Sequence, residues 1–344
     1  MIEPLLQQVW DAIERELPGE EAAEPPAPCT AVLLCSRYEG RAVWGVFRDR
    51  AREPFLFVKV DHTKPQKARL RREHATLVAL RDRADLRSRV PHPVALLERG
   101  SKLVLVQTAV PGTPLHVRLR RRLRARPEQS RIEHLQVLDF LRRLQTSAPA
   151  QSITVDPETV VDKVRSLQDL DGADLAGSPE LSALARDWSP VELPIMAGHG
   201  DLSPSNCMID GDRLGVIDWE GGAYERTALV DVIVFLYRYA LVHPGPARAP
   251  RKRLGQIAGF RRAFLGDGWL PRLTAASYCR EVQQLGIPAS AADFLLIATL
   301  ADLASGAAIT HRPTSPRSRT FWTAALQAYL QEHPRSAVRR LVAT

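Results

Sequence analysis

The stretch 199–220, HGDLSPSNCMIDGDRLGVIDWE, contains a histidine, several spaced acids and Asn206, the only asparagine in the 344-residue chain. Its second half has two apolar runs around an Asp-Gly pair, which is typical of a β-hairpin. Such a hairpin predicts that Asn206, at the start of one strand, and Asp218, just past the other, lie at the same end. Asp201 lies in the loop that leads to that end. We therefore expect two carboxylates and one amide oxygen to converge, a set of hard ligands suited to Mg²⁺.

The spacing of His199, Gly200, Asp201 and Asn206 matches the catalytic loop of phosphoryl-transfer enzymes. In those enzymes an Asp accepts the proton of the acceptor hydroxyl, an Asn holds metal and a later Asp binds Mg²⁺. The alternative is an Asx-turn loop in which Asn206 and Asp201 satisfy backbone groups. Asp218 follows an apolar run in VIDWE, and this position favours the metal site.

A lysine inside an apolar strand gives an independent indication. The run FLFVKV places Lys59 in a predicted strand, and the chain has few other lysines. On the predicted helix 63–83, Glu73 falls within the apolar stripe of Leu70, Leu77 and Leu80. A carboxylate directed into the interior is costly unless it is paired, so we expect Glu73 to pair with Lys59. The alternative is that Lys59 extends to solvent and Glu73 lies at the edge of the stripe.

These motifs together resemble the aminoglycoside phosphotransferase and choline kinase-like family, whose members have a protein-kinase-like fold. The resemblance covers about residues 30–330 in element order and is specific at HGDLSPSN and VIDWE. It implies an α+β, bilobal fold with a small antiparallel-sheet N-lobe and a larger helical C-lobe. It also implies that Asp201 is the catalytic base, that His199 braces its loop and that Asn206 and Asp218 bind metal. Asp231 would tie a following helix to the catalytic loop, or simply end that helix.

Two parts of the sequence depart from the family pattern or leave its assignment open. The phosphate-covering loop expected at 36–45, SRYEGRAVWG, has only Gly40 before the second strand. Ser203 and Ser205 stand where relatives frequently have a His and a Gly. The segment 106–115 resembles the hinge between lobes, where backbone groups around Thr108 and Val110 would meet a nucleobase. An ordinary strand-to-helix connection explains that segment equally well.

Composition restricts the class of protein. A chain of this length suits two lobes, and its longest uncharged stretch, near 293–310, is interrupted by Asp302 and predicts a buried helix rather than a membrane span. The acidic N-terminus argues against a secretory signal, and four cysteines without a CxxC pair indicate neither zinc nor disulfides. We expect a cytoplasmic protein. The net charge is +8, and the arginine-rich run 118–131 forms either a solvated helix face or a surface for anionic partners.

The predicted organisation has three parts. An amphipathic helix at 3–17 and a Pro/Glu linker at 18–28 precede an N-lobe at 29–110, and a helical C-lobe follows at 111–344. The N-lobe has the order β-β-β-α-β-β. In the C-lobe we expect few strands. Helices are expected near the following positions: 115–125, 128–147, 178–188, 228–242, 254–266, 271–285, 289–306 and 318–332.

The resulting hypothesis is a kinase that uses Mg²⁺ and ATP, or GTP, to phosphorylate a hydroxyl of a small molecule. Acceptor contacts are expected near 220–245 and 270–310, with Trp219, Glu220, Tyr224 and Arg226 as candidates. The alternative is a pseudokinase that senses nucleotides or acts as a scaffold, which the atypical loop at 36–45 favours. A kinase of proteins or of lipopolysaccharide-type sugars is a third possibility. No motif indicates a nucleic-acid or membrane partner, and the oligomeric state is left open.

Overall fold

The computed structural model describes residues 29–37, 41–122, 126–146, 151–171, 181, 185–243, 255–306 and 316–343. The chain divides into two compact units. The sheet unit comprises Met1–Thr113 and Met208–Gly222, and the helical unit comprises Pro114–Cys207 and Ala223–Thr344. The predicted N-terminal helix and linker lie outside the described residues. The segment 208–222 clusters with the sheet unit, whereas the sequence-based division at residue 110 had assigned it to the helical part.

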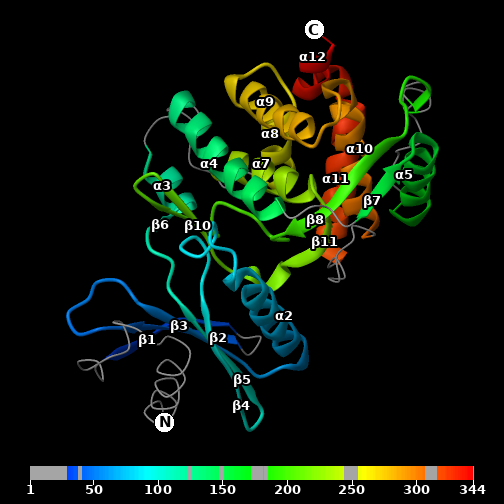
Figure 1. Ribbon diagram of the computed structural model, residues 1–344. Coiled ribbons are helices and arrows are strands. Elements are labelled where there is room, and N and C mark those ends of the chain that lie inside the picture. Colours follow the sequence, from blue (N-terminus) through cyan, green and yellow to red (C-terminus); the bar gives the residue numbers. More distant parts are fainter. Residues whose placement is uncertain are drawn as a thin grey trace. The chain divides into compact units, whose positions relative to one another are not determined.

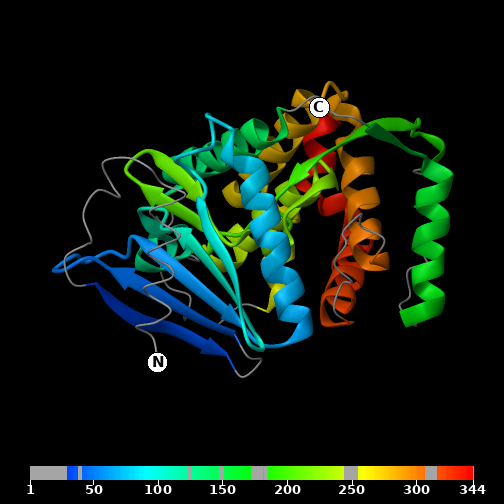
Figure 2. The same ribbon diagram turned by 60° about the horizontal axis from the view of Figure 1, so that its bottom comes forward.

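The sheet unit is built on a five-stranded antiparallel sheet with the order β1-β2-β3-β5-β4 (Figure 1). Its strands are β1 (Thr30–Arg37), β2 (Arg41–Phe47), β3 (Leu56–Asp61), β4 (Pro93–Arg99) and β5 (Lys102–Thr108). The helix α2 (Lys64–Arg81) connects β3 to β4 and packs against β3, β4 and β5. Figure 2 shows this helix running beside the sheet. The predicted order β-β-β-α-β-β is confirmed.

The two faces of this sheet have different neighbours because side chains alternate along each strand. Val58 and Val60 of β3 belong to one apolar cluster, which includes Val104 and Val106 of β5. Leu103 and Leu105, which alternate with those valines, pack against Leu70 of α2. Residues of β3 that alternate with Val58 and Val60 therefore face α2.

A β-hairpin completes the sheet unit, as the Asp-Gly pair predicted. The strands β9 (Cys207–Asp210) and β10 (Arg213–Val216) are neighbours in a small sheet of order β10-β9-β6, where β6 is Thr113–Pro114. Gly211 at the turn has φ +59°, a conformation that glycine adopts without steric cost. The short 3₁₀ helix η1 (Trp219–Gly221) follows β10 and contacts α2.

The helical unit consists mainly of α-helices around the almost entirely buried α7 and α10. Its α-helices are α3 (Leu115–Arg121), α4 (Pro127–Gln145), α5 (Pro157–Asp171), α7 (Val230–Val242), α8 (Gln256–Phe264), α9 (Trp269–Gln284), α10 (Ala292–Ser305), α11 (Pro316–Gln331) and α12 (Ala337–Val342). Two 3₁₀ turns, η2 (Ala289–Ala291) and η3 (His333–Arg335), flank α10 and α11. Most of the helix predicted near 178–188 lies outside the described residues.

The expectation of few strands in this part of the chain was wrong. A three-stranded antiparallel sheet of order β11-β8-β7 is present, formed by β7 (Gln151–Val155), β8 (Val191–Gly198) and β11 (Ala223–Thr227). Pro194 lies inside β8, and because proline cannot donate to a ladder it conceals such a strand in the sequence. The helix α5 was also missed.

The buried helix predicted near 293–310 is present as α10 (Ala292–Ser305). Asp293 at the start of α10 accepts a hydrogen bond from Tyr329 Oη at 2.6 Å and lies 2.7 Å from His333 Nε2. These bonds satisfy a carboxylate that is otherwise inside the core. Among the described helices, none has the length and apolarity needed to cross a membrane.

Candidate active site

Lys59 lies in the middle of β3, on the face that packs against α2. Its Nζ is 2.6 Å from Oε1 and 2.9 Å from Oε2 of Glu73, which is completely buried. Glu73 extends from α2 between Leu70 and Leu77, both also buried. The pairing that the strand alternation and the helical period predict is therefore present in the structure.

Asp218 is the second carboxylate on the same ammonium. Its Oδ1 lies 2.9 Å from Lys59 Nζ. Burial, the largest single influence, lowers the pKa of Lys59, but the charges and hydrogen bonds of Glu73 and Asp218 together outweigh it, so the net pKa is raised. Lys59 is thus a fixed positive charge.

Asp218 is held in an unusual backbone conformation. Its φ and ψ are +68° and +61°, the left-handed region that residues with a side chain rarely adopt. Trp219, fully buried, donates from its indole nitrogen to Val216 O at 3.0 Å and so closes the turn. Gly222 lies so close to α2 that a Cβ there would be 2.7 Å from Thr76 Cγ2. These contacts fix the segment that carries Asp218, and such strain is common at functional sites.

Arg41, at the start of β2, joins that segment to the sheet. It donates to both carboxylate oxygens of Asp61, at 3.2 and 3.1 Å, and to Glu220 Oε2 at 2.7 Å. Burial, the largest influence, lowers the pKa of Arg41, but its bonds to Asp61 and Glu220 produce a net increase. This network could not be predicted, because nothing in the sequence distinguishes Arg41 from the many other arginines.

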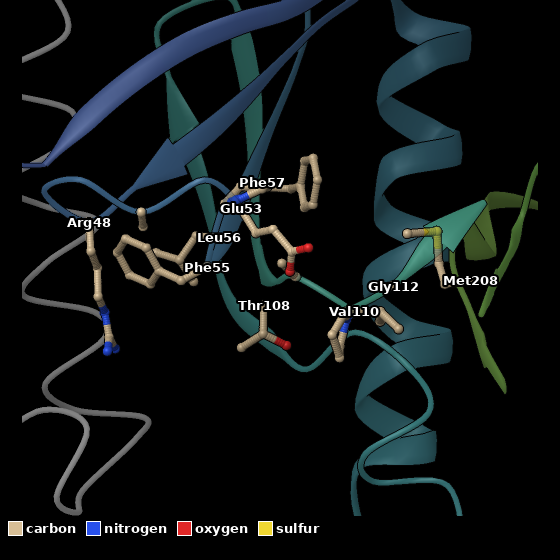
Figure 3. Close-up of a pocket in the computed structure, with 13 residues that line it drawn as sticks. Arg48, Glu53, Phe55, Leu56, Phe57, Thr108, Val110, Gly112 and Met208 are labelled. Atoms are coloured by element: carbon tan, nitrogen blue, oxygen red, sulfur yellow. The ribbon is translucent and has the colours of Figure 1, made fainter. Parts of the chain in front are cut away.

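A cavity of about 420 Å³ opens beside the segment 106–115, which is called the hinge segment below. Figure 3 shows Arg48 and Phe55 at one end of it and Val110 and Met208 at the other, with Thr108 between them. Thr108 and Val110, the residues expected to meet a nucleobase, both line this cavity.

The backbone of the hinge segment retains one donor. Thr108 N–H donates to His92 O and Ala109 N–H to Phe55 O, both at 2.9 Å, and Pro111 has no N–H. The Val110 N–H makes no hydrogen bond within the described part of the chain. A ligand in the cavity could therefore accept a bond from Val110.

Gly112 allows the hinge segment to pass β9. Its φ is +113°, and a Cβ at this position would lie 2.7 Å from the carbonyl carbon and oxygen of Ile209. Only glycine avoids both the strain and the backbone clash.

The phosphate-covering loop expected at 36–45 is much shorter in the structure. Arg37 of β1 pairs with Arg41 of β2, so most of the expected loop is strand. The tip of the loop, 38–40, lies outside the described residues.

The loop that carries Asp201 belongs to the helical unit and is anchored to α7. Asp231 in the first turn of α7 accepts hydrogen bonds from the backbone N–H groups of His199 and Gly200, at 2.6 and 2.8 Å. The fully buried His199 accepts from Asp201 N through Nδ1 at 3.3 Å. Both of these acceptors constrain the backbone beside Asp201.

The amide of Asn206 is oriented by the same loop. Its Nδ2 donates to Asp201 O at 2.9 Å, whereas its Oδ1 accepts no hydrogen bond from any described residue. Ser203 and Ser205 contact each other, with 2.7 Å between their Oγ atoms. An oriented amide oxygen and the partly exposed Asp218 carboxylate are the donors that Mg²⁺ prefers. The described residues contain no cluster of three or more His, Cys, Asp or Glu that could hold a metal.

The expected convergence of Asn206 and Asp218 involves one residue of each unit and stays a prediction.

Of the acceptor candidates, Trp219 is fully buried and Glu220 is bound to Arg41. The side chains of Tyr224 and Arg226 lie outside the described residues.

The arginine-rich run 118–131 contains ion pairs. Arg122 pairs with Glu133, which is 1% exposed, and Arg131 pairs with Glu128 one turn away, at 2.9 Å. Residues 123–125 lie outside the described part. Arg122 is thus a structural residue, and Arg131 belongs to a solvated helix face.

A lysine on a β-strand that is held by a glutamate of the next helix is the arrangement of kinase-like phosphotransferases. The sequence model described as the Phosphotransferase enzyme family matches residues 43–269, about two-thirds of the 344 residues. The chain belongs to this family, and the predicted fold class and family are confirmed.

Solved structures similar to this chain are themselves phosphotransferases. An aminoglycoside phosphotransferase from Streptomyces rimosus is 16% identical over 95% of this chain and 99% of its own, with a TM-score of 0.39. The same enzyme in complex with ADP and streptomycin is 14% identical over 92% and 98%, with a TM-score of 0.41. A spectinomycin phosphotransferase in complex with ADP and spectinomycin is 10% identical over 95% and 98%, with a TM-score of 0.39. No curated protein matches the chain.

Proposed function

We propose that this protein transfers the γ-phosphoryl group of ATP, or of GTP, to a hydroxyl of a small molecule. The observation that carries the proposal is the buried ion pair of Lys59 and Glu73, with Asp218 on the same ammonium. Burying the charges of Lys59 and Glu73 is costly, which favours a functional role for the pair. A lysine fixed in this way is suited to hold nucleotide phosphates.

The nucleotide would occupy the sheet unit. The cavity beside the hinge segment has room for a purine, and the Val110 N–H supplies a donor to its ring nitrogen. Lys59 then neutralises charge on the phosphates, with Glu73 holding the ammonium in place. This division of roles is a proposal that rests on the geometry of these three residues.

Phosphoryl transfer would use the loop that precedes β9. Asp201 accepts the proton of the acceptor hydroxyl as the hydroxyl oxygen bonds to the γ-phosphorus, and the bond from that phosphorus to the bridging oxygen breaks to release the nucleoside diphosphate. Asn206 and Asp218 would hold Mg²⁺, which when bound neutralises the charge that develops on the phosphates. His199 and Asp231 act by holding the backbone on either side of Gly200.

The test is transfer of radioactive phosphate from γ-labelled ATP and GTP to a panel of neutral sugars, aminoglycosides, amino alcohols and nucleosides. We expect label in at least one acceptor class with the wild type and loss of transfer in Asp201→Asn. Asp187→Asn, an exposed acid of the helical unit, serves as the matched control and should transfer normally. Undiminished transfer by Asp201→Asn would remove Asp201 from the role of base. Nucleotide binding without transfer to any acceptor would favour the pseudokinase alternative.

A further inference from the structure

A second cavity, of about 180 Å³, lies within the helical unit. It is enclosed by residues of four elements, α4, β8, α7 and α9, which can be followed in Figure 1. Apolar side chains form much of its wall, among them Met196, Leu229 and Val232. The proposed catalytic and nucleotide-binding residues do not line it.

One acid of the cavity wall lacks a direct hydrogen-bond partner among the described residues. Glu281 of α9 is 6% exposed, yet its carboxylate makes no hydrogen bond or ion pair with any described residue. Burial raises the pKa of Glu281 to about 7, against the smaller opposing charges of Arg142 and Arg280, while Asp139 adds to the increase. A nearly buried carboxylate that lacks a partner is uncommon in folded proteins.

Two donors of the cavity wall are already used. Arg142, which lines the same cavity, pairs with Asp139 on its own helix. Gln145 directs its amide nitrogen to Ala228 O at 3.2 Å. Glu281 therefore lies in a cavity wall that includes apolar side chains, and Arg142 and Arg280 act on its charge without a direct ion pair.

We propose that this cavity binds a small organic ammonium compound, with the ammonium group on Glu281 and the carbon chain against Met196, Leu229 and Val232. A cation with an apolar body matches both features of the site, the unpaired acid and the apolar wall. The side chain of Arg142 is 47% exposed and pairs with Asp139, which also pairs with Arg143, so it is solvent that screens its repulsion of the ligand. The site is independent of the proposed phosphoryl transfer.

The experiment uses the full chain and n-butylammonium at pH 8, with binding followed by ligand-observed NMR titration. Neutral n-butanol, which has the same carbon chain, is the comparison ligand. We expect saturable binding of the amine and at least about tenfold weaker binding of the alcohol, because the alcohol lacks the charge that pairs with Glu281.

Two variants locate the binding site. Glu281→Gln keeps the shape of the side chain and removes its charge, so the affinity for n-butylammonium should fall at least about tenfold. Gln284→Lys places an ammonium three residues along α9, at an exposed position that lines the cavity, and should displace the amine by pairing with Glu281. Glu98→Gln, an exposed acid of the sheet unit, is the control and should bind normally.

Each result supports or overturns the proposal. Loss of binding in both Glu281→Gln and Gln284→Lys, with Glu98→Gln unchanged, supports it. Wild-type affinity in Glu281→Gln, equal binding of butanol and butylammonium, or no saturable binding of the amine by the wild type overturns it. Near-ultraviolet circular dichroism of each variant shows whether a loss of binding reflects a loss of fold. Gln284→Lys changes only an exposed side chain, so it decides the question even if Glu281→Gln fails to fold.

Discussion

Lys59 Nζ lies 2.6 Å from Glu73 Oε1 and 2.9 Å from Asp218 Oδ1, so one buried ammonium joins β3, α2 and the residue that precedes η1. The three groups are far apart in the sequence and meet because β3 turns this face toward α2. Their arrangement makes the proposed nucleotide site part of the core of the sheet unit. Substitutions there should change stability and nucleotide binding by separable amounts.

Lys59→Met leaves Glu73 buried without its partner. The free energy of unfolding should fall by about 3 kcal/mol, since breaking a buried ion pair leaves an uncompensated charge. The double variant Lys59→Met/Glu73→Gln should recover part of that loss but should still not bind ATP. Urea denaturation and ATP titration of the three proteins measure the two effects. Wild-type ATP affinity in Lys59→Met would exclude Lys59 from the phosphate site.

Arg41→Met removes the link among β2, Asp61 and Glu220. Asp61 is completely buried, so the free energy of unfolding should fall by about 3 kcal/mol. Arg71→Met, which breaks an exposed pair with Glu98, is the matched control and should cost less than about 1 kcal/mol. Equal losses in the two variants, measured by urea denaturation, would show that the Arg41 network adds nothing beyond a surface pair.

Asp231→Asn should loosen the loop that carries Asp201. The two oxygens of the Asp231 carboxylate each accept a hydrogen bond from one backbone N–H group. The amide of Asn has only one oxygen, so it can accept only one of these two bonds. We expect the free energy of unfolding to fall by about 2 kcal/mol and kcat to decrease while KM for ATP stays constant. Steady-state kinetics at saturating acceptor separates these constants. A changed KM for ATP with an unchanged kcat is the result that this account does not allow.

Because the pKa of Glu281 is raised in the folded protein, the free energy of unfolding should depend on pH. Burial raises its pKa from 4.5 in the unfolded reference to about 7, so the folded protein keeps a proton that the unfolded chain has lost. This stabilisation is complete below about pH 4.5 and is lost as the pH rises through about 7. At pH 8, Glu281→Gln should therefore be more stable than the wild type by on the order of 2 kcal/mol.

The difference between Glu281→Gln and the wild type should become smaller toward pH 5. Thermal unfolding of both proteins across this pH range checks it, with Glu98→Gln as a control that shows little pH dependence. A pH-independent difference would mean that Glu281 does not titrate in this way.

The parts of the site that obey local rules could be predicted from the sequence. The Asp-Gly turn indicated the β9–β10 hairpin, and the helical period placed Glu73 on the buried face of α2. Lys59 was recognisable because an apolar strand seldom contains a lysine without a partner. In each case two or three neighbouring residues determine the outcome.

The remaining features depend on contacts between distant segments. The Arg41 network joins strands β2 and β3 to Glu220, and no local sequence pattern predicts that these segments are in contact. The sheet of β7, β8 and β11 depends on pairing between segments that a helix separates, and Pro194 hides its central strand. The left-handed conformation of Asp218 likewise depends on its surroundings, because residues other than glycine adopt it uncommonly, even though Asp does so more often than most.

The central claim is that Asp218 binds the magnesium that holds the nucleotide. A thermal-shift titration with ATP, with Mg²⁺ or with EDTA, tests it directly on the wild type, on Asp218→Asn and on the exposed control Asp210→Asn. Ligand at 100 times its Kd stabilises the native state by about 2.7 kcal/mol, enough to raise the melting temperature measurably. We predict a shift that requires Mg²⁺ in the wild type and in Asp210→Asn, and no Mg²⁺-dependent shift in Asp218→Asn. An equal Mg²⁺-dependent shift in Asp218→Asn, or no shift with ATP in the wild type, would contradict the account.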